Sequence, residues 1–203
     1  MKKLLIIVMM LCVCSGMSAQ VAGGRKNPYS QYTVPISNMP KGAVQFDELE
    51  GKSVYIQTTG TDGDVQIVWL ANSRTGQLTK VCQTNPQAGV QWERMNQPTS
   101  NGVSVQLNQI AKAEKAYIAP GDGSKVIVEG CPDGRNIWTY VIDTKTHSAI
   151  QFPSTEGVAE INHDTGELTL GFYSYDDEGR YGYQKVFTTG GKFLRRLPGK
   201  DRY

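Results

Sequence analysis

The sequence is poor in the residues on which most catalytic sites depend. It contains two histidines and four cysteines in 203 residues. It has no Gly-x-Ser-x-Gly nucleophile motif, no His-Glu-x-x-His zinc motif and no glycine-rich phosphate-binding loop. Both histidines, His147 and His163, stand in segments rich in Asp, Thr and Gly, which predict turns. The sequence therefore carries no recognised catalytic signature, and it indicates neither a bound metal nor a cofactor.

A long hydrophobic run is also missing. The apolar stretch near the N terminus, Leu4–Val13, has ten residues, whereas a membrane-spanning helix needs about 20. Lys2 and Lys3 precede this stretch and small residues follow it, with Ala19 near the expected cleavage point. This is the layout of a secretory signal peptide. We expect residues 1–20 to be a bacterial-type signal peptide. We also expect that the protein has no membrane span and that it is exported to the periplasm, the cell surface or the extracellular medium.

A surplus of positive charge is missing as well. The whole chain has 21 Lys and Arg residues against 19 Asp and Glu. Without Lys2 and Lys3 the basic residues also number 19, so the exported form is formally neutral. Nucleic-acid binding usually requires a clear basic excess on the domain. We therefore expect no nucleic-acid partner.

Two cysteines, Cys82 and Cys131, remain after removal of the signal peptide. Their spacing fits no zinc motif, and no Cys-x-x-Cys redox motif is present. In an oxidising compartment they would form a disulfide, worth roughly 4 kcal/mol in the chain-entropy model. The alternative is two buried thiols, since cysteine packs well as a small hydrophobe. The sequence favours the disulfide.

The rest of the chain is rich in strand and turn signals. Residues 21–43 contain Pro and Gly without an apolar period and predict an extended N-terminal arm. Residues 44–203 predict a single β-rich domain, in which β-branched and aromatic runs alternate with tight turns such as "SRTG", "TKTH" and "HDTG". Asp, Asn and Gly favour such turns because they tolerate the left-handed backbone conformation.

The strand and turn pattern repeats along the domain. Residues 117–153 align with residues 160–198, and residues 54–83 form a shorter version of the same unit. The units extend over about 53–84, 115–157 and 158–198. A repeat of roughly 40–45 residues with four antiparallel strands has the size of a propeller blade, although three units are fewer than the four to eight blades of a closed ring.

The expected fold class is all-β. The sequence favours an antiparallel meander of hairpins that forms a sandwich or barrel, with three propeller-blade-like units as the alternative. Residues 105–117 are rich in helix formers, so they predict at most one short helix. Residues 84–102 predict a long loop, in which Trp92 would cover one end of the core.

Acidic residues gather at the expected turns. The candidates for a calcium site or a carboxylate pair are Asp62, Asp64, Asp122 and the segment 176–178. Each stands where a hairpin must reverse, and turns favour Asp for conformational reasons alone. His163 beside Asp164 is a further candidate, with the same alternative explanation. We interpret all of these residues as turn residues.

The most unusual segment is residues 171–187, which contain six aromatic residues. If Asp177 and Glu178 form the hairpin tip, Tyr183 lies opposite Phe172 and Tyr181 lies opposite Ser174. One face of the hairpin then carries Phe172, Tyr181 and Tyr183. The other face carries the predicted ligand-binding residues, which are Tyr173, Tyr175 and Arg180. The alternative is that neighbouring sheets or the N-terminal arm cover both faces.

Three classes of function are compatible with these observations. The sequence favours an exported, non-catalytic β-rich binding module whose ligand is a glycan or an envelope protein. An exported hydrolase acting on saccharides is the first alternative, and it would need two carboxyl groups about 5–10 Å apart. A structural or assembly protein that pairs through exposed strand edges is the second.

Overall fold

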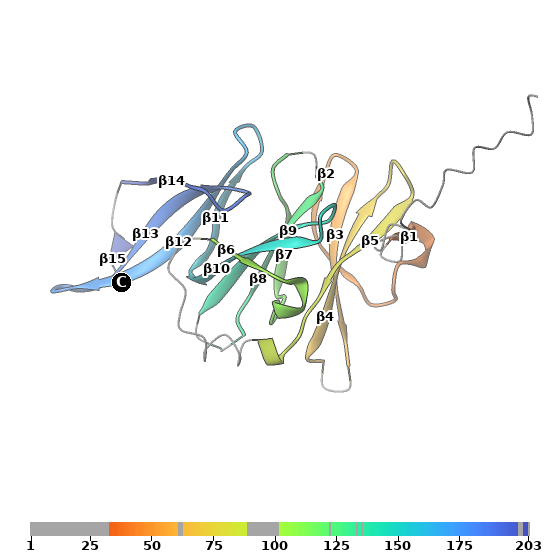
Figure 1. The fold of residues 1–203 in the computed structure, drawn as a ribbon, viewed down its shortest axis with the longest axis horizontal. Coiled ribbons are helices and arrows are strands. Elements are labelled where there is room, and N and C mark those ends of the chain that lie inside the picture. The colour runs from red at the N-terminus through yellow and green to blue at the C-terminus, as the bar shows by residue number, and fades with distance from the viewer. Residues whose placement is uncertain are drawn as a thin grey trace, which may run out of the picture. The chain divides into compact units, whose positions relative to one another are not determined.

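The computed structural model describes residues 33–60, 63–88, 102–121, 123–132, 134, 136–198 and 201–202. Its regular structure consists of short antiparallel strands, and no helix of seven or more residues occurs in these ranges. Three sheets follow one another along the chain, and we name them A, B and C (Figure 1). The all-β class and the hairpin repeat predicted from the sequence are confirmed.

Sheet A contains five strands in the order β1-β5-β4-β3-β2. Their bounds are β1 (Thr33–Pro35), β2 (Val44–Leu49), β3 (Lys52–Thr59), β4 (Val65–Asn72) and β5 (Gln77–Gln83). The short 3-10 helix η2 (Ile36–Asn38) follows β1. Part of the expected N-terminal arm is therefore a strand, because β1 pairs with β5 at the edge of the sheet.

Sheet B repeats this arrangement in the order β6-β10-β9-β8-β7. Its strands are β6 (Val103–Val105), β7 (Lys115–Ile118), β8 (Lys125–Gly130), β9 (Ile137–Asp143) and β10 (Ser148–Thr155). The helix-forming composition of residues 105–117 yields one 3-10 turn, η3 (Leu107–Gln109). Ala111, Ala113 and Ala116 are buried in a core shared with sheet A, so tertiary packing outweighs helix propensity there.

Sheet C is the third meander, in the order β11-β12-β13-β14. Its strands are β11 (Gly157–Asn162), β12 (Glu167–Asp176), β13 (Gly179–Thr188) and β14 (Phe193–Arg196), and β15 (Asp201–Arg202) also pairs with β13. The chain completes each meander before it begins the next, so each sheet is a separate unit. This topology corresponds to the blade-like alternative of the sequence analysis.

The three sheets pack through two hydrophobic clusters, and sheet B contributes to both. Val126 and Val128 of β8 belong to the cluster shared with sheet A, whereas Ile127 between them belongs to the cluster shared with sheet C. Because successive strand residues point to opposite faces, both faces of sheet B are buried. Sheets A and C each pack one face in these clusters and turn the other away from sheet B.

Tight turns connect the strands as the sequence predicts. The side-chain oxygens of Asn72, Asp143 and Asn162 each accept hydrogen bonds from the two backbone N–H groups that lie two and three residues further on. The residue four positions after each of them has a positive φ: Gly76 65°, His147 53° and Gly166 73°. The repeated turn segments, such as "SRTG" and "HDTG", are therefore hairpin turns in which one residue has a left-handed backbone conformation.

The predicted disulfide is wrong in this structure, because the sulfur atoms of Cys82 and Cys131 are not bonded. Cys82 lies on β5 inside the core between sheets A and B, whereas Cys131 follows β8 of sheet B and is half-buried. Burial raises the pKa of the Cys82 thiol to about 12, so this thiol is protonated at neutral pH. Cys82 therefore fits the alternative of the sequence analysis, in which a buried thiol packs as a small hydrophobic side chain.

Candidate binding face

The hairpin of β12 and β13 has the register that its turn predicts. Tyr175 lies opposite Arg180, and Phe172 lies opposite Tyr183. Asp177 and Glu178 form the tip, where Asp176 Oδ1 accepts a hydrogen bond of 3.0 Å from the backbone N–H of Glu178. The predicted division of the aromatic residues between two faces is therefore confirmed.

The inner face of this hairpin packs toward sheet B. Leu168, Leu170, Phe172 and Phe187 are each at most 2% exposed and belong to the cluster that sheets B and C share. The Phe172 and Tyr183 rings stack with centroids 5.8 Å apart. This set of side chains is part of the core, so its role is to hold sheet C in place.

The outer face carries the three predicted ligand-binding residues, and we call them the tyrosine face. The Tyr175 side chain is 68% exposed, and within the described part of the chain its hydroxyl has no hydrogen-bond partner. The Tyr173 and Tyr175 rings meet edge to face, with centroids 6.0 Å apart. The Arg180 guanidinium lies 4.3 Å from the centroid of the Tyr173 ring. The structure thus brings all three residues together.

Two further residues hold the tyrosine face in its conformation. The Tyr173 hydroxyl donates a hydrogen bond of 3.0 Å to Asn136 Oδ1, and Arg180 Nη2 donates one of 2.6 Å to Glu156 Oε1. The Arg180 and Glu156 side chains are 42% and 32% exposed, so this ion pair contributes little to folding stability. Its main effect is to fix the position of the guanidinium over the Tyr173 ring.

A small hollow adjoins the tyrosine face where glycines replace side chains. Gly157, Gly171 and Gln184 lie in one cross-strand row, and Gly182 lies opposite Tyr173 in the next row of the same face. Glu156 leans over this floor, because its Cβ would lie 3.0 Å from a Cβ placed on Gly171. The hollow is lined by Glu156, Gly157, Val158, Ala159, Gly171, Phe172, Gly182, Tyr183 and Gln184. It therefore presents a carboxylate, an amide and backbone groups, while the Phe172 and Tyr183 rings point to the inner face of the sheet.

The other polar candidates lie in turns or outside the described residues. His147 and His163 occupy hairpin turns, and burial lowers the pKa of His147 although the nearby Asp143 opposes this shift. Asp62, Asp122 and Trp92 lie outside the described residues. Within the described ranges, no group of three or more His, Cys, Asp or Glu side chains is arranged to hold a metal ion.

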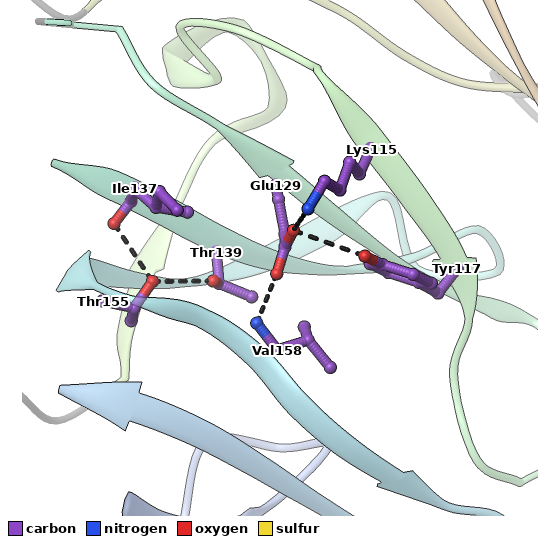
Figure 2. A network of polar contacts seen from close by, with 7 residues as sticks. All are labelled: Lys115, Tyr117, Glu129, Ile137, Thr139, Thr155 and Val158. Carbon is purple, nitrogen blue, oxygen red and sulfur yellow. Dashed lines mark hydrogen bonds and ion pairs between the residues drawn. The ribbon is translucent and has the colours of Figure 1, made fainter. Parts of the chain in front are cut away.

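Sequence reasoning missed one buried carboxylate, Glu129 on β8, whose side chain is 5% exposed (Figure 2). Its Oε1 accepts a hydrogen bond from the backbone N–H of Val158 at the start of sheet C. Its Oε2 accepts a hydrogen bond of 3.4 Å from the Tyr117 hydroxyl and lies 3.8 Å from Lys115 Nζ. Burial, followed by the Glu129 charge, raises the pKa of Tyr117 to about 12.

A separate pair of hydrogen-bonded threonines lies next to this network, because Thr139 is opposite Glu129 in the register of β8 and β9. The Thr139 and Thr155 hydroxyls are 3.0 Å apart, and the Thr155 hydroxyl donates a hydrogen bond of 3.0 Å to the Ile137 carbonyl (Figure 2). Both carboxylate oxygens of Glu129 are thus occupied by groups of sheets B and C. We interpret Glu129 as a structural link between the two sheets, and a glutamate within the apolar run "KVIVEG" was the sequence signal for it.

No protein-family model matches the sequence, and no curated protein matches it. The structure is similar to the β-propeller domain of the Trilobed protease from Pyrococcus furiosus, which has an open velcro topology. The TM-score is 0.50 and the identity 13%, over 78% of this chain and 44% of that one. Pyrococcus horikoshii acylaminoacyl peptidase also matches, with a TM-score of 0.45 and 14% identity over 83% of this chain and 27% of that one.

The chain spans less than half the length of either of these structures. At such low identity the first likeness bears on the fold alone, and it supports the blade-like interpretation of sheets A, B and C. No helix within the described ranges is long and apolar enough to cross a membrane.

Proposed function

We propose that the chain is an exported, non-catalytic module that binds a glycan on the tyrosine face of sheet C. The observation that carries this proposal is the exposure of Tyr175, 68%, with its ring set against Tyr173 on the face of sheet C that also carries the polar hollow. Aromatic rings offer a flat apolar surface to the C–H face of a sugar. Charged and amide groups at its margin, here Arg180, Glu156 and Gln184, provide hydrogen bonds for sugar hydroxyls.

The chemistry of the hollow favours a glycan over a protein ligand. Large contiguous apolar patches on a protein surface mark sites of protein interaction. On the tyrosine face, Tyr175 is the large exposed apolar group, and its neighbours are charged, polar or glycine. A narrow, polar, glycine-floored hollow beside one exposed ring is better suited to a single sugar unit than to a protein surface.

A hydrolase is less well supported by the same site. Glycoside hydrolysis usually needs two carboxyl groups on either side of the bond that is cut. Among the described residues that line the hollow, Glu156 is the one acidic side chain, and it is paired with Arg180. Export of the module rests on residues 1–20, which have the composition of a signal peptide.

The test is a glycan-array screen of residues 21–203, followed by calorimetric titration of the ligands that it finds. The double variant Tyr173→Ala/Tyr175→Ala should lose binding, with a melting temperature lowered by a few degrees at most. The matched control is Phe46→Ala, which removes a 41% exposed aromatic ring from sheet A. Its affinity should equal that of the unaltered protein. Unfolding of the double variant, or equal loss of affinity in the control, would show that the tyrosine face is not a binding site.

A further inference from the structure

Sheets A and B each have an extra strand that covers the fourth strand of the meander. In sheet A, β1 pairs antiparallel with β5. In sheet B, β6 pairs antiparallel with β10. The corresponding fourth strand of sheet C is β14, and no described strand pairs with its second edge (Figure 1). We call this side of β14 the open edge, because it lies where the other two sheets are covered.

The turns that lead into the fourth strands identify the equivalent positions. Each of these turns ends with a residue of positive φ, which is Gly76 (65°) in sheet A, His147 (53°) in sheet B and Gly191 (86°) in sheet C. In sheets A and B, the second and third residues after it are paired with β1 or β6. In sheet C the same two positions are Phe193 and Leu194.

Covered and open positions differ in exposure. At the second position after the turn residue, Leu78 of β5 and Ala149 of β10 are 0% and 1% exposed. At the open edge, Phe193 is 44% and Leu194 37% exposed, and every residue of β14 is classed as exposed. Large apolar side chains exposed on an unpaired strand mark a surface that another chain can cover.

The backbone of β14 is oriented to accept a further strand. The Leu197 N–H donates a hydrogen bond of 3.0 Å to the Gln184 carbonyl, so it points toward β13. Because the N–H groups alternate in direction along a strand, the N–H of Arg196 points to the open edge. An extended segment along this edge would pair with β14 through main-chain hydrogen bonds.

The missing strand cannot come from the position that supplies the other two. β1 and β6 each precede the meander that they cover. Before sheet C, Glu156 is the single residue between β10 and β11, which leaves no room for a strand. A β14 strand from a second copy is unfavourable as well. It would bring Arg195 and Arg196 of both copies into one short ladder, where like charges repel.

The charge of the open edge indicates the chemistry of its partner. Lys192 and Arg196 are exposed, and neither takes part in the ion pairs between described residues. Arg195 is neutralised on the outer face, where it donates hydrogen bonds of 2.6 and 2.7 Å to the carboxylate of Glu167. A partner strand with acidic residues would therefore complement the edge, whereas a basic strand would be repelled.

We infer that the open edge of β14 binds an extended acidic segment of another protein, which adds a further strand to sheet C. The strands that cover the equivalent edges, "TVP" in β1 and "VSV" in β6, are short and contain β-branched residues. A segment of this kind would cover Phe193 and Leu194, and its acidic residues would face Lys192 and Arg196. The surface is an edge of sheet C and not the tyrosine face, so the inference does not depend on the proposed function.

The experiment titrates the synthetic peptide acetyl-Thr-Val-Glu-Val-Glu-Val-amide into residues 21–203 and follows the backbone amide signals by NMR. The signals of β13 and β14 should shift. The same peptide with lysine in place of both glutamates should bind at least tenfold more weakly, because it repels the basic edge. The acidic peptide methylated on every backbone nitrogen has no donors for strand pairing and should not bind.

Three variants of Arg196 separate strand pairing from charge. Arg196→Pro removes the outward N–H at a place where an edge strand tolerates proline, and it should weaken peptide binding at least tenfold. Arg196→Lys keeps the N–H and the charge and should weaken it less than threefold, while Arg196→Gln keeps the N–H alone and should give an intermediate loss. Thermal unfolding confirms that each variant is folded. Tyr173→Ala/Tyr175→Ala should bind the peptide as the unaltered protein does, so failure of the glycan proposal is distinguishable from failure of this one.

Three results would overturn the inference. Equal binding of the acidic peptide and its fully methylated form would show that no strand pairing occurs. No shift in the unaltered protein would show that the arginines and the bulge at Leu194 protect the edge from pairing. A concentration-dependent dimer in light scattering, with shifted β14 signals and no peptide present, would assign the edge to a second copy of the chain.

Discussion

The two faces of the β12–β13 hairpin use neighbouring residues for opposite purposes. Phe172 is 2% exposed and packs in the core, while Tyr175, three residues further along the same strand, is 68% exposed. The difference arises from the strand period of two, which sends alternate aromatic residues to opposite sides of the sheet. The aromatic residues of this hairpin therefore form two sets. One set stabilises the fold, and the other is available to a ligand.

The residues of sheet B also alternate between two faces, but neither face is exposed to a ligand. Both faces of sheet B lie in hydrophobic clusters, so its alternate residues, such as Ile127 and Val128, are all structural. The outer face of sheet A has aromatic residues as well, but their polar atoms are satisfied within the sheet. Trp69 Nε1 donates to Gln57 Oε1 at 3.2 Å and the Tyr55 hydroxyl to Gln45 Oε1 at 3.0 Å. The tyrosine face differs because, among the residues that the structure describes, the Tyr175 hydroxyl has no hydrogen-bond partner.

The largest expected effect is on the inner face. Phe172→Ala removes a buried ring between Tyr183 and Phe187 and should lower the free energy of unfolding by about 3–5 kcal/mol. Chemical denaturation measures this change. A loss below about 1 kcal/mol, the size usual for surface substitutions, would contradict the distinction between the two faces.

The link between sheets B and C should give the next largest effect. Glu129→Gln keeps the shape of the side chain but weakens the charge-assisted hydrogen bonds to Val158 and Tyr117. We expect a loss of about 1–3 kcal/mol, measured by denaturation. Glu160→Gln, which changes an exposed carboxylate on β11, is the control and should change stability by less than about 0.5 kcal/mol. An unchanged or raised stability of Glu129→Gln would show that Glu129 is not a structural link.

Arg180→Lys tests how the tyrosine face is ordered. Lysine keeps the charge but loses the planar group that stacks on Tyr173 and reaches Glu156. Stability should fall by less than about 1 kcal/mol, in line with an exposed cation–π contact. Affinity for the glycan found by the array should fall several-fold in calorimetric titration. Affinity equal to that of the unaltered protein would mean that Arg180 neither contacts nor positions the ligand.

The sequence predicted the pairing of this hairpin because a two-residue tip fixes every opposed position, and Asp177 and Glu178 form that tip. It predicted the turns because Asn72 and its counterparts act on neighbouring backbone groups, which lie close in the sequence. Both features are local. Their geometry therefore follows from residue type and spacing.

The features that the sequence could not reveal are those that depend on distant segments. β2 lies before the first repeat unit, which the sequence predicts from about residue 53, and a bulge between Gln45 and Asp47 interrupts its strand period. Glu129 is buried because Val158, from another sheet, supplies its donor. The spacing of Cys82 and Cys131 carried no information on the distance between them in space, which decides whether a disulfide can form.

The smallest expected effect concerns the fall of the melting temperature at acid pH. The hydrogen bonds from Arg195 hold the pKa of Glu167 below its usual value of 4.5. A carboxyl with a lowered pKa in the folded state adds stability above its unfolded pKa and loses it as the pH falls through the folded pKa. Glu167→Gln should therefore flatten the fall in melting temperature below about pH 4.5, measured by scanning fluorimetry at low salt. An identical fall in both proteins would contradict this assignment.

The most direct test of the account compares two measurements on Tyr175→Ala, which are the glycan affinity and the melting temperature. We predict an affinity at least tenfold weaker, equivalent to about 1.4 kcal/mol, with a melting temperature within about 2 °C of the unaltered protein. Unchanged affinity, or a loss of stability comparable to that of Phe172→Ala, would contradict the claim that the exposed tyrosines are a binding surface.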